Sequence, residues 1–110
     1  LAVLTNKPEA ISRQLLAGLG LLDRFAEVLG GDSLPTRKPD PAGLAELAAR
    51  PDLAVDRLLM VGDSRNDAFA AANAGSPCVL VSWGFKPKAE LLALPARAVI
   101  DCPADLLAWL

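Results

Sequence analysis

The sequence predicts an α/β fold in which helices cover both faces of a parallel sheet, giving three layers. Its apolar runs, such as residues 58–61 and 78–81, are continuous rather than alternating, as is typical of strands buried on both faces. Helical segments separate these runs, so right-handed crossovers should bring every strand-to-helix turn to one edge of the sheet. With 110 residues, of which 53% are hydrophobic, the chain is large enough for one domain with its own core.

The first unit is predicted to be a strand, a polar turn and a helix. Residues 1–4 are apolar, Thr5-Asn6-Lys7 leaves this strand, and Pro8 suits the first turn of a helix that closes near Gly18 and Gly20. One face of that helix is apolar and carries Ile11, Leu15, Leu16 and Leu19. Because termini are normally polar, an apolar run at the first residue suggests a chain cut from a longer one.

A second strand is predicted at 26–29, followed by a loop at 30–35 whose glycines allow unusual backbone angles. The basic pair Arg37-Lys38 comes next. Asp40 is expected to cap a helix that has Pro41 at its first position. The inward positions of this helix are Leu44, Leu47 and Ala48.

The centre of the chain is the stretch 58–75. Its apolar run predicts a buried strand at 58–61, Gly62-Asp63-Ser64 forms the turn, and a helix should follow from Arg65 to Ala74 and end at Gly75. The remaining predicted elements are a strand at 78–81, a loop at 82–85, a helix at 86–94, a strand at 98–100 and a helix at 103–110.

Two carboxylates bracket this central turn, and only one has a purely structural explanation. Ser64 can cap the helix, and Asp67, three residues later, can complete a capping box and complement the helix dipole. Asp63 directly follows the buried strand, beside a glycine. Since ligands of open α/β sheets bind at the carboxyl ends of the strands, an acidic residue there suggests a metal site.

Four turns should meet at this edge of the sheet: Thr5-Asn6, the loop with Arg37-Lys38, the stretch Gly62 to Asp67, and Ser82 to Phe85. A phosphoryl group needs hydrogen-bond donors, which Thr5 and Lys38 can supply. Mg²⁺ needs carboxylates and keeps several waters, and Asp63 suits it. Taken singly, each residue also has a plain reading, such as a solvated surface lysine.

Composition excludes several classes of partner. The net charge is -2 with no basic run, so we expect no nucleic-acid partner and no anionic membrane surface. No apolar run approaches the roughly 20 residues that span a bilayer, and no signal peptide is evident, so a cytoplasmic location is expected. Cys78 and Cys102 form no CxxC motif, the chain has no histidine, and reduced structural thiols are expected.

Three motifs resemble the second, third and fourth motifs of the haloacid dehalogenase superfamily. They are Leu4-Thr5-Asn6-Lys7, Arg37-Lys38-Pro39-Asp40-Pro41 and Gly62-Asp63-Ser64-Arg65-Asn66-Asp67. The stretches LAVLTNKP, GGDSLPTRKPDP and VGDSRNDAFAAANAG resemble bacterial phosphoglycolate phosphatases. The resemblance covers nearly the whole chain. It implies that residues 1–110 are the carboxyl-terminal part of a Rossmann-like hydrolase core.

The resemblance also implies the chemistry of the whole protein. That chemistry is Mg²⁺-dependent hydrolysis of a phosphomonoester through an aspartyl-phosphate, with a small phosphorylated metabolite, 2-phosphoglycolate, as substrate. Thr5, backbone donors around Asn6, and Lys38 would bind the transferring phosphoryl group, and Lys38 would also offset charge on the nucleophile.

On the metal side, the resemblance assigns Asp63 as a ligand of Mg²⁺. Asp67 would act from outside the ligand sphere, through a metal-bound water or by orienting Lys38, with Ser64 beside it. The loop at Trp83-Gly84-Phe85 would line the entrance.

The resemblance also predicts parts that residues 1–110 do not contain. No DxDx[TV] segment is present, so the first motif, which supplies the nucleophile, is missing, as is the cap domain inserted after it. We therefore expect the isolated chain to be inactive. The missing strand would lie between strands 1–4 and 58–61. The open edges should then bind the missing amino-terminal segment, pair directly with each other, or self-associate.

Three alternatives stay open at this point. The substrate could be a sugar phosphate or another small phosphomonoester, because specificity owes much to the absent cap. The chain could be a folded fragment without catalytic activity. A receiver domain of a response regulator also combines acidic residues, threonine, lysine and Mg²⁺, but in the reverse order along the chain.

Overall fold

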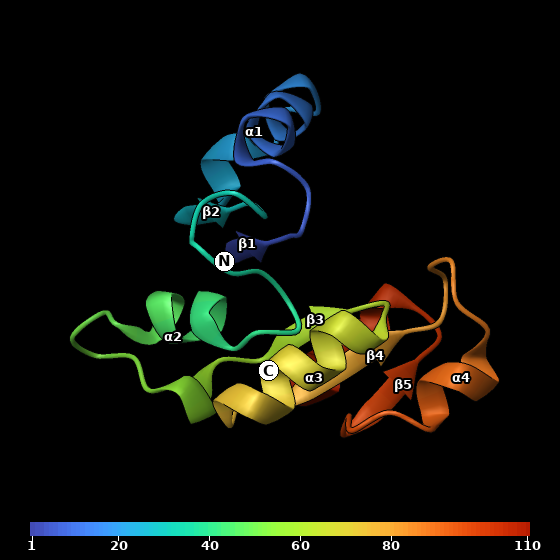
Figure 1. The fold of residues 1–110 in the computed structure, drawn as a ribbon. Helices are drawn as coiled ribbons and strands as arrows, with labels where there is room; N and C mark the ends of the chain where they lie inside the picture. The colour runs from blue at the N-terminus through green and yellow to red at the C-terminus, as the bar shows by residue number, and fades with distance from the viewer.

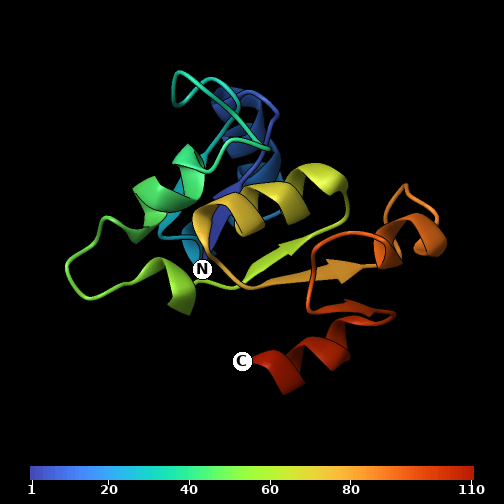
Figure 2. The ribbon, with the colours of Figure 1, turned by 60° about the horizontal axis from the view of Figure 1, so that its bottom comes forward.

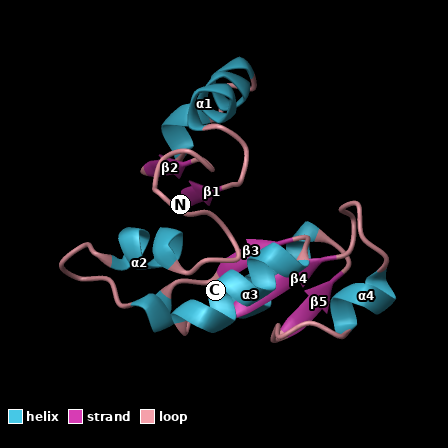
Figure 3. Cartoon of the chain, viewed as in Figure 1, coloured by secondary structure: helices cyan, strands magenta, loops and turns pink.

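The computed structural model describes residues 1–110 and contains five short parallel strands arranged in two sheets (Figures 1 and 3). One sheet has the order β1-β2 and the other β3-β4-β5. The strands are β1 (Ala2–Leu4), β2 (Glu27–Leu29), β3 (Met60–Gly62), β4 (Cys78–Val81) and β5 (Ala98–Ile100). The helices are α1 (Glu9–Gly18), α2 (Ala42–Ala48), α3 (Arg65–Ala74) and α4 (Lys88–Leu92), with 3₁₀ turns η1 (Leu22–Arg24), η2 (Val55–Arg57) and η3 (Pro103–Trp109).

Several predicted bounds are those of the structure, and others shift by one or two residues. Helix α3 and strands β4 and β5 have the predicted bounds. Strand β3 begins at Met60 instead of residue 58, because the N–H of Leu58 still donates to the carbonyl of Val55 and closes the turn η2. The last element is a 3₁₀ helix, and α4 is shorter than expected.

The larger sheet is buried on both faces, as predicted from its continuous apolar runs. Cys78 and Leu80 of β4 face a cluster that includes α3, whereas Val79 and Val81 join Ile100 in a second cluster. Side chains of successive strand residues point to opposite faces of a sheet. Because all four residues of β4 are buried, both faces of the sheet are covered at this strand. Figure 2 shows α3 on one face of this sheet and the C-terminal 3₁₀ helix on the other.

Strands β1 and β3 do not pair with each other, so the sheet is interrupted where the resemblance places a further strand. Of the three outcomes expected for the open edges, direct pairing of the two strands is therefore the one that the structure contradicts. The two halves still share packing, because Leu4 of β1 packs against the larger core cluster and its methyl groups lie against Gly43 of α2. Each of the two strands keeps one backbone edge without a strand partner in this chain.

The apolar face of α1 is exposed. Ile11, Leu15 and Leu19 are 58%, 54% and 62% exposed, while the buried residue of this helix is Ser12. The physical reason is that α1 packs against β2 of a two-stranded sheet, which is too small to cover the apolar stripe. The helix was predicted correctly, but its apolar face has no cover within the chain.

Both cysteines are free thiols, and Cys78 is buried in the core. Burial, together with the nearby Asp67 carboxylate, raises the pKa of the Cys78 thiol to about 12. This cysteine is therefore a neutral core side chain, as expected for a structural thiol. No helix combines the length and the apolar character that crossing a bilayer requires.

Candidate functional site

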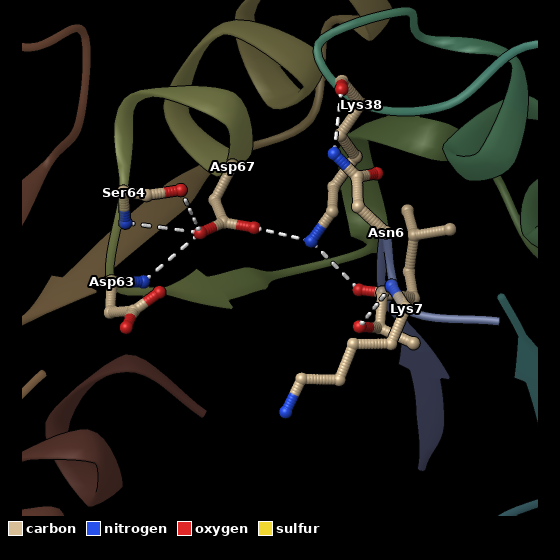
Figure 4. A network of polar contacts seen from close by, with 8 residues as sticks. Asn6, Lys7, Lys38, Asp63, Ser64 and Asp67 are labelled. Carbon is tan, nitrogen blue, oxygen red and sulfur yellow. Dashed lines mark hydrogen bonds and ion pairs between the residues drawn. The ribbon is translucent and has the colours of Figure 1, made fainter. Parts of the chain in front are cut away.

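Lys38 joins the two halves of the molecule at the carboxyl ends of their strands (Figure 4). Its Nζ donates to the backbone carbonyl of Leu4, at the end of β1, over 2.8 Å. It also forms an ion pair with Oδ1 of Asp67, in the first turn of α3, at 2.5 Å. The two side chains are only 10% and 6% exposed. An ammonium group has three N–H donors, so one remains for a ligand.

Asp67 is the centre of this network. Its Oδ2 accepts hydrogen bonds from the N–H of Asp63 (3.0 Å), the N–H of Ser64 (3.1 Å) and the hydroxyl of Ser64 (3.0 Å). The predicted capping box of α3 is thus present. The other oxygen holds Lys38, so of the two roles expected for Asp67, the orientation of Lys38 is the one that its contacts support.

Gly62 makes room for the Asp67 carboxylate. A Cβ atom built on Gly62 would overlap the carboxyl carbon and Oδ2 of Asp67. The φ angle of Gly62 is not positive, so the backbone conformation itself does not require glycine. The absent side chain lets the end of β3 approach the first turn of α3, which aims Asp67 at Lys38.

The carboxylate of Asp63 has no partner in the chain. It takes part in no hydrogen bond or ion pair, although its backbone N–H is held by Asp67. Figure 4 shows the side chain turned away from the contacts between Asp67 and Lys38. A half-buried carboxylate that is free at the carboxyl end of a strand is available to a cation.

Thr5 and Asn6 offer donors on the β1 side of the same edge. The hydroxyl oxygen of Thr5 accepts from the N–H of Lys7 at 3.2 Å, which leaves the hydroxyl proton free. The backbone N–H of Asn6 makes no hydrogen bond within the chain. These two groups and the ammonium of Lys38 can donate to the oxygens of an anion such as a phosphate.

The side chain of Asn6 is only half satisfied. Its Nδ2 donates to the carbonyl of Lys38 over 2.9 Å, which ties the β1 turn to the loop that carries the lysine. Its Oδ1 is buried and has no hydrogen-bond partner. Leaving a buried acceptor unpaired costs about 1–3 kcal/mol, so a hydrogen bond from a water or a ligand to this oxygen would be favourable.

The loop after β4 reaches the site by its backbone. A Cβ atom built on Gly84 would lie 2.6 Å from Cβ and Oδ2 of Asp63. Trp83 and Phe85, on either side, are 50% and 98% exposed. Arg37 takes no part in the network, and the amino group of Lys7 has no partner.

The residues of this chain fit a divalent cation only as part of its ligand set. No group of three or more His, Cys, Asp or Glu side chains is placed to hold a metal ion. Asp63 offers one free carboxylate, while both oxygens of Asp67 are engaged. Mg²⁺ is commonly bound by one or two carboxylates together with waters and substrate phosphate, and this donor set matches that pattern in part.

A surface pocket of about 290 Å³ lies elsewhere, between β2 and α2, and contains none of the predicted site residues. It is lined by Glu27, Leu29, Glu46, Leu47, Ala49 and Arg50. The exposed Glu27 and Arg50 form a loose ion pair across it at 3.4 Å. It holds none of the donors described above.

Sequence reasoning did not identify three features of the site. These are the Leu4 carbonyl that binds Lys38, the amide of Asn6 that holds the lysine loop, and the contact between Gly84 and Asp63. A backbone carbonyl carries no sequence signal. The glycine in the loop at 82–85 was a visible signal, because it follows a strand adjacent to β3.

The parallel halves and the lysine, threonine and aspartates at their carboxyl ends define a class of hydrolase core. The sequence profile of the family described as haloacid dehalogenase-like hydrolase matches residues 1–81. The chain belongs to this family. The resemblance seen in the three motifs is thereby confirmed.

Individual relatives carry a more specific name. The phosphoglycolate phosphatase of Rhodospirillum rubrum is 47% identical over 110 residues, which cover 100% of this chain and 45% of the relative. That of Neisseria meningitidis is 49% identical over 85 residues, 77% of this chain and 36% of the relative. The chain thus spans less than half the length of these relatives.

Solved structures agree on the fold. A crystal structure of a predicted phosphoglycolate phosphatase from Haemophilus somnus superposes with a TM-score of 0.92 at 38% identity. It is matched over 99% of this chain and 48% of that one. The α/β, Rossmann-like class expected from the sequence is therefore confirmed.

Proposed function

We propose that the protein carrying this chain is a Mg²⁺-dependent phosphatase of small phosphomonoesters, with 2-phosphoglycolate as its substrate. The observation that carries the proposal is the cluster of donors around Lys38, beside the free carboxylate of Asp63. The names of the relatives support the choice of substrate. Residues 1–110 would be the carboxyl-terminal part of its core domain, and a cytoplasmic location stays a prediction.

Each residue has a defined task in this proposal. The hydroxyl of Thr5, the N–H of Asn6 and the ammonium of Lys38 hold the phosphoryl oxygens, and the positive charge of Lys38 offsets the negative charge that spreads over these oxygens during transfer. Asp67 keeps Lys38 in place through its ion pair. Asp63 would ligate Mg²⁺, which supplies further neutralisation of phosphate charge when bound.

The attacking group lies outside residues 1–110 in this proposal. A carboxylate of the first motif forms a bond to phosphorus while the ester oxygen leaves with a proton, and water then cleaves the aspartyl-phosphate to release inorganic phosphate. No aspartate of this chain stands in a DxDx[TV] segment. Both carboxylate oxygens of Asp67 are engaged within the chain, and the proposal assigns the free carboxylate of Asp63 to Mg²⁺, so neither takes that role.

An assay of phosphate release tests the proposal. We expect the full-length protein to hydrolyse 2-phosphoglycolate with Mg²⁺ and to lose this activity with EDTA, while residues 1–110 alone are inactive. Glucose 6-phosphate, assayed in parallel, tests the alternative sugar-phosphate substrate. Activity of the 110-residue chain would overturn the assignment of the nucleophile to a segment outside it, and an inactive full-length protein would overturn the function itself.

The unpaired edges of β1 and β3 predict a second property. We infer that an amino-terminal strand of the full-length protein pairs with both edges, and that the isolated chain covers them by self-association. Light scattering after size-exclusion chromatography checks this: residues 1–110 should form dimers or larger species that dissociate when the amino-terminal part is added. A stable monomer of residues 1–110 at all concentrations would contradict the inference.

A further inference from the structure

The loop between β4 and α4 lies against the carboxylate proposed to bind the metal. Strands β3 and β4 are neighbours in parallel register, with Gly62 opposite Leu80, so the turns that follow them come together at one edge. At that edge the backbone of Gly84 meets the side chain of Asp63. A Cβ atom on Gly84 would lie 2.6 Å from both Cβ and Oδ2 of Asp63 and 3.0 Å from Cγ.

Space, and not backbone conformation, is the reason for glycine at this position. Only Gly20 and Gly75 have positive φ angles, so the backbone at Gly84 suits any L-residue. The close approach includes Cβ of Asp63, which is fixed to its own backbone. A rotation of the Asp63 side chain would therefore not relieve the clash, and either the loop or the end of β3 would have to move.

The loop is also tied down at both ends by one carboxylate. Asp101, directly after β5, accepts from the hydroxyl of Ser82 at 2.7 Å and from the ammonium of Lys88 at 2.7 and 2.8 Å. The N–H of Ser82 further donates to the carbonyl of Ile100 at 3.0 Å. Residues 82 and 88 are thus both bound to Asp101. We call the segment 82–88, which contains Gly84, the strap.

We propose that Gly84 is a positioning residue for Asp63: its missing side chain lets the strap of residues 82–88 contact Asp63 and fix the direction of its free carboxylate. The proposal rests on the proposed function, because it concerns a carboxylate assigned to Mg²⁺. A carboxylate with no hydrogen bond of its own needs such a neighbour to limit its rotamers.

Binding of Mn²⁺ alone to the full-length protein tests this. The free ion is measured by electron paramagnetic resonance, and each variant's fold is followed by thermal unfolding. We expect Gly84→Ala to raise the Kd for Mn²⁺ by about 10-fold, the lower end of what loss of a supporting contact costs a metal site. Gly18→Ala is the matched control, because a Cβ there meets nothing within 4 Å.

Further variants separate the possible failures. Asp63→Asn should weaken Mn²⁺ binding most, and adding Gly84→Ala to it should cause no further loss, because both act through one carboxylate. If Asp63→Asn leaves the Kd unchanged, the metal role in the proposed function is wrong. If Asp63→Asn weakens binding but Gly84→Ala does not, the positioning role alone is overturned.

One variant loosens the strap without adding an atom near Asp63. Lys88→Met removes the tie to Asp101 at the far end of the strap. It should raise the Kd in the same direction as Gly84→Ala but by less, since Ser82 still holds the other end. Should Gly84→Ala fail to fold, an unchanged Kd in Lys88→Met would overturn the proposal.

Discussion

Replacement of Lys38 by methionine is expected to lower kcat/KM for 2-phosphoglycolate about 10²–10³-fold, as removal of one preorganised charge-stabilising donor does. It should also lower the free energy of unfolding by about 3–5 kcal/mol, because it leaves the Asp67 carboxylate as an unpaired charge in a buried position. Steady-state kinetics of the full-length protein and urea unfolding measure the two effects.

Two controls show whether the buried pair is responsible. In Lys38→Met/Asp67→Asn no charge is left unpaired, so this double variant should regain part of the lost stability but none of the activity. Arg50→Met removes the exposed ion pair with Glu27 and should change stability by less than about 1 kcal/mol. Wild-type stability in Lys38→Met would contradict the structural role of this pair.

Gly62→Ala is expected to have the second large effect. Its methyl group would overlap the Asp67 carboxylate, so either α3 moves or Asp67 releases Lys38. Overpacking of this kind costs about 1–3 kcal/mol, and kcat should fall as the lysine loses its orientation. Thermal unfolding and kcat of the full-length protein measure both consequences.

The same substitution in open space gives the comparison. Gly18→Ala at the end of α1 adds an identical methyl group with no atom within 4 Å, so stability should stay equal or rise by up to about 1 kcal/mol. If Gly62→Ala behaves like Gly18→Ala in both measurements, the close approach of β3 to Asp67 has no functional consequence.

Local signals explain which elements could be predicted. Helix α3 is bounded by a capping box at Ser64 and by Gly75 in the left-handed region, with a φ of 78°, and both ends are legible in the sequence. The start of strand β3 was misplaced by two residues because Leu58 and Leu59 continue its apolar run, although they lie between the turn η2 and the strand. Apolar periodicity locates an element better than it locates its ends.

The site was predictable as a set of residues but not as a set of contacts. Parallel strands bring their carboxyl ends together, so Thr5, Lys38, Asp63 and Asp67 could be assigned to one edge. The partners of Lys38 depend on how the two halves dock, which no short motif encodes. The exposed face of α1 was missed for a similar reason, since periodicity shows that a face is apolar and says nothing of what covers it.

The position of Lys38 has a consequence for folding. Its two partners, Leu4 of β1 and Asp67 of α3, are 34 and 29 residues away along the chain. Such long-range contacts form only after the entropy of closing the intervening loops has been overcome. Lys38 can therefore reach its observed position only when both halves are folded and docked, so a partly folded chain would lack the contacts that orient this lysine.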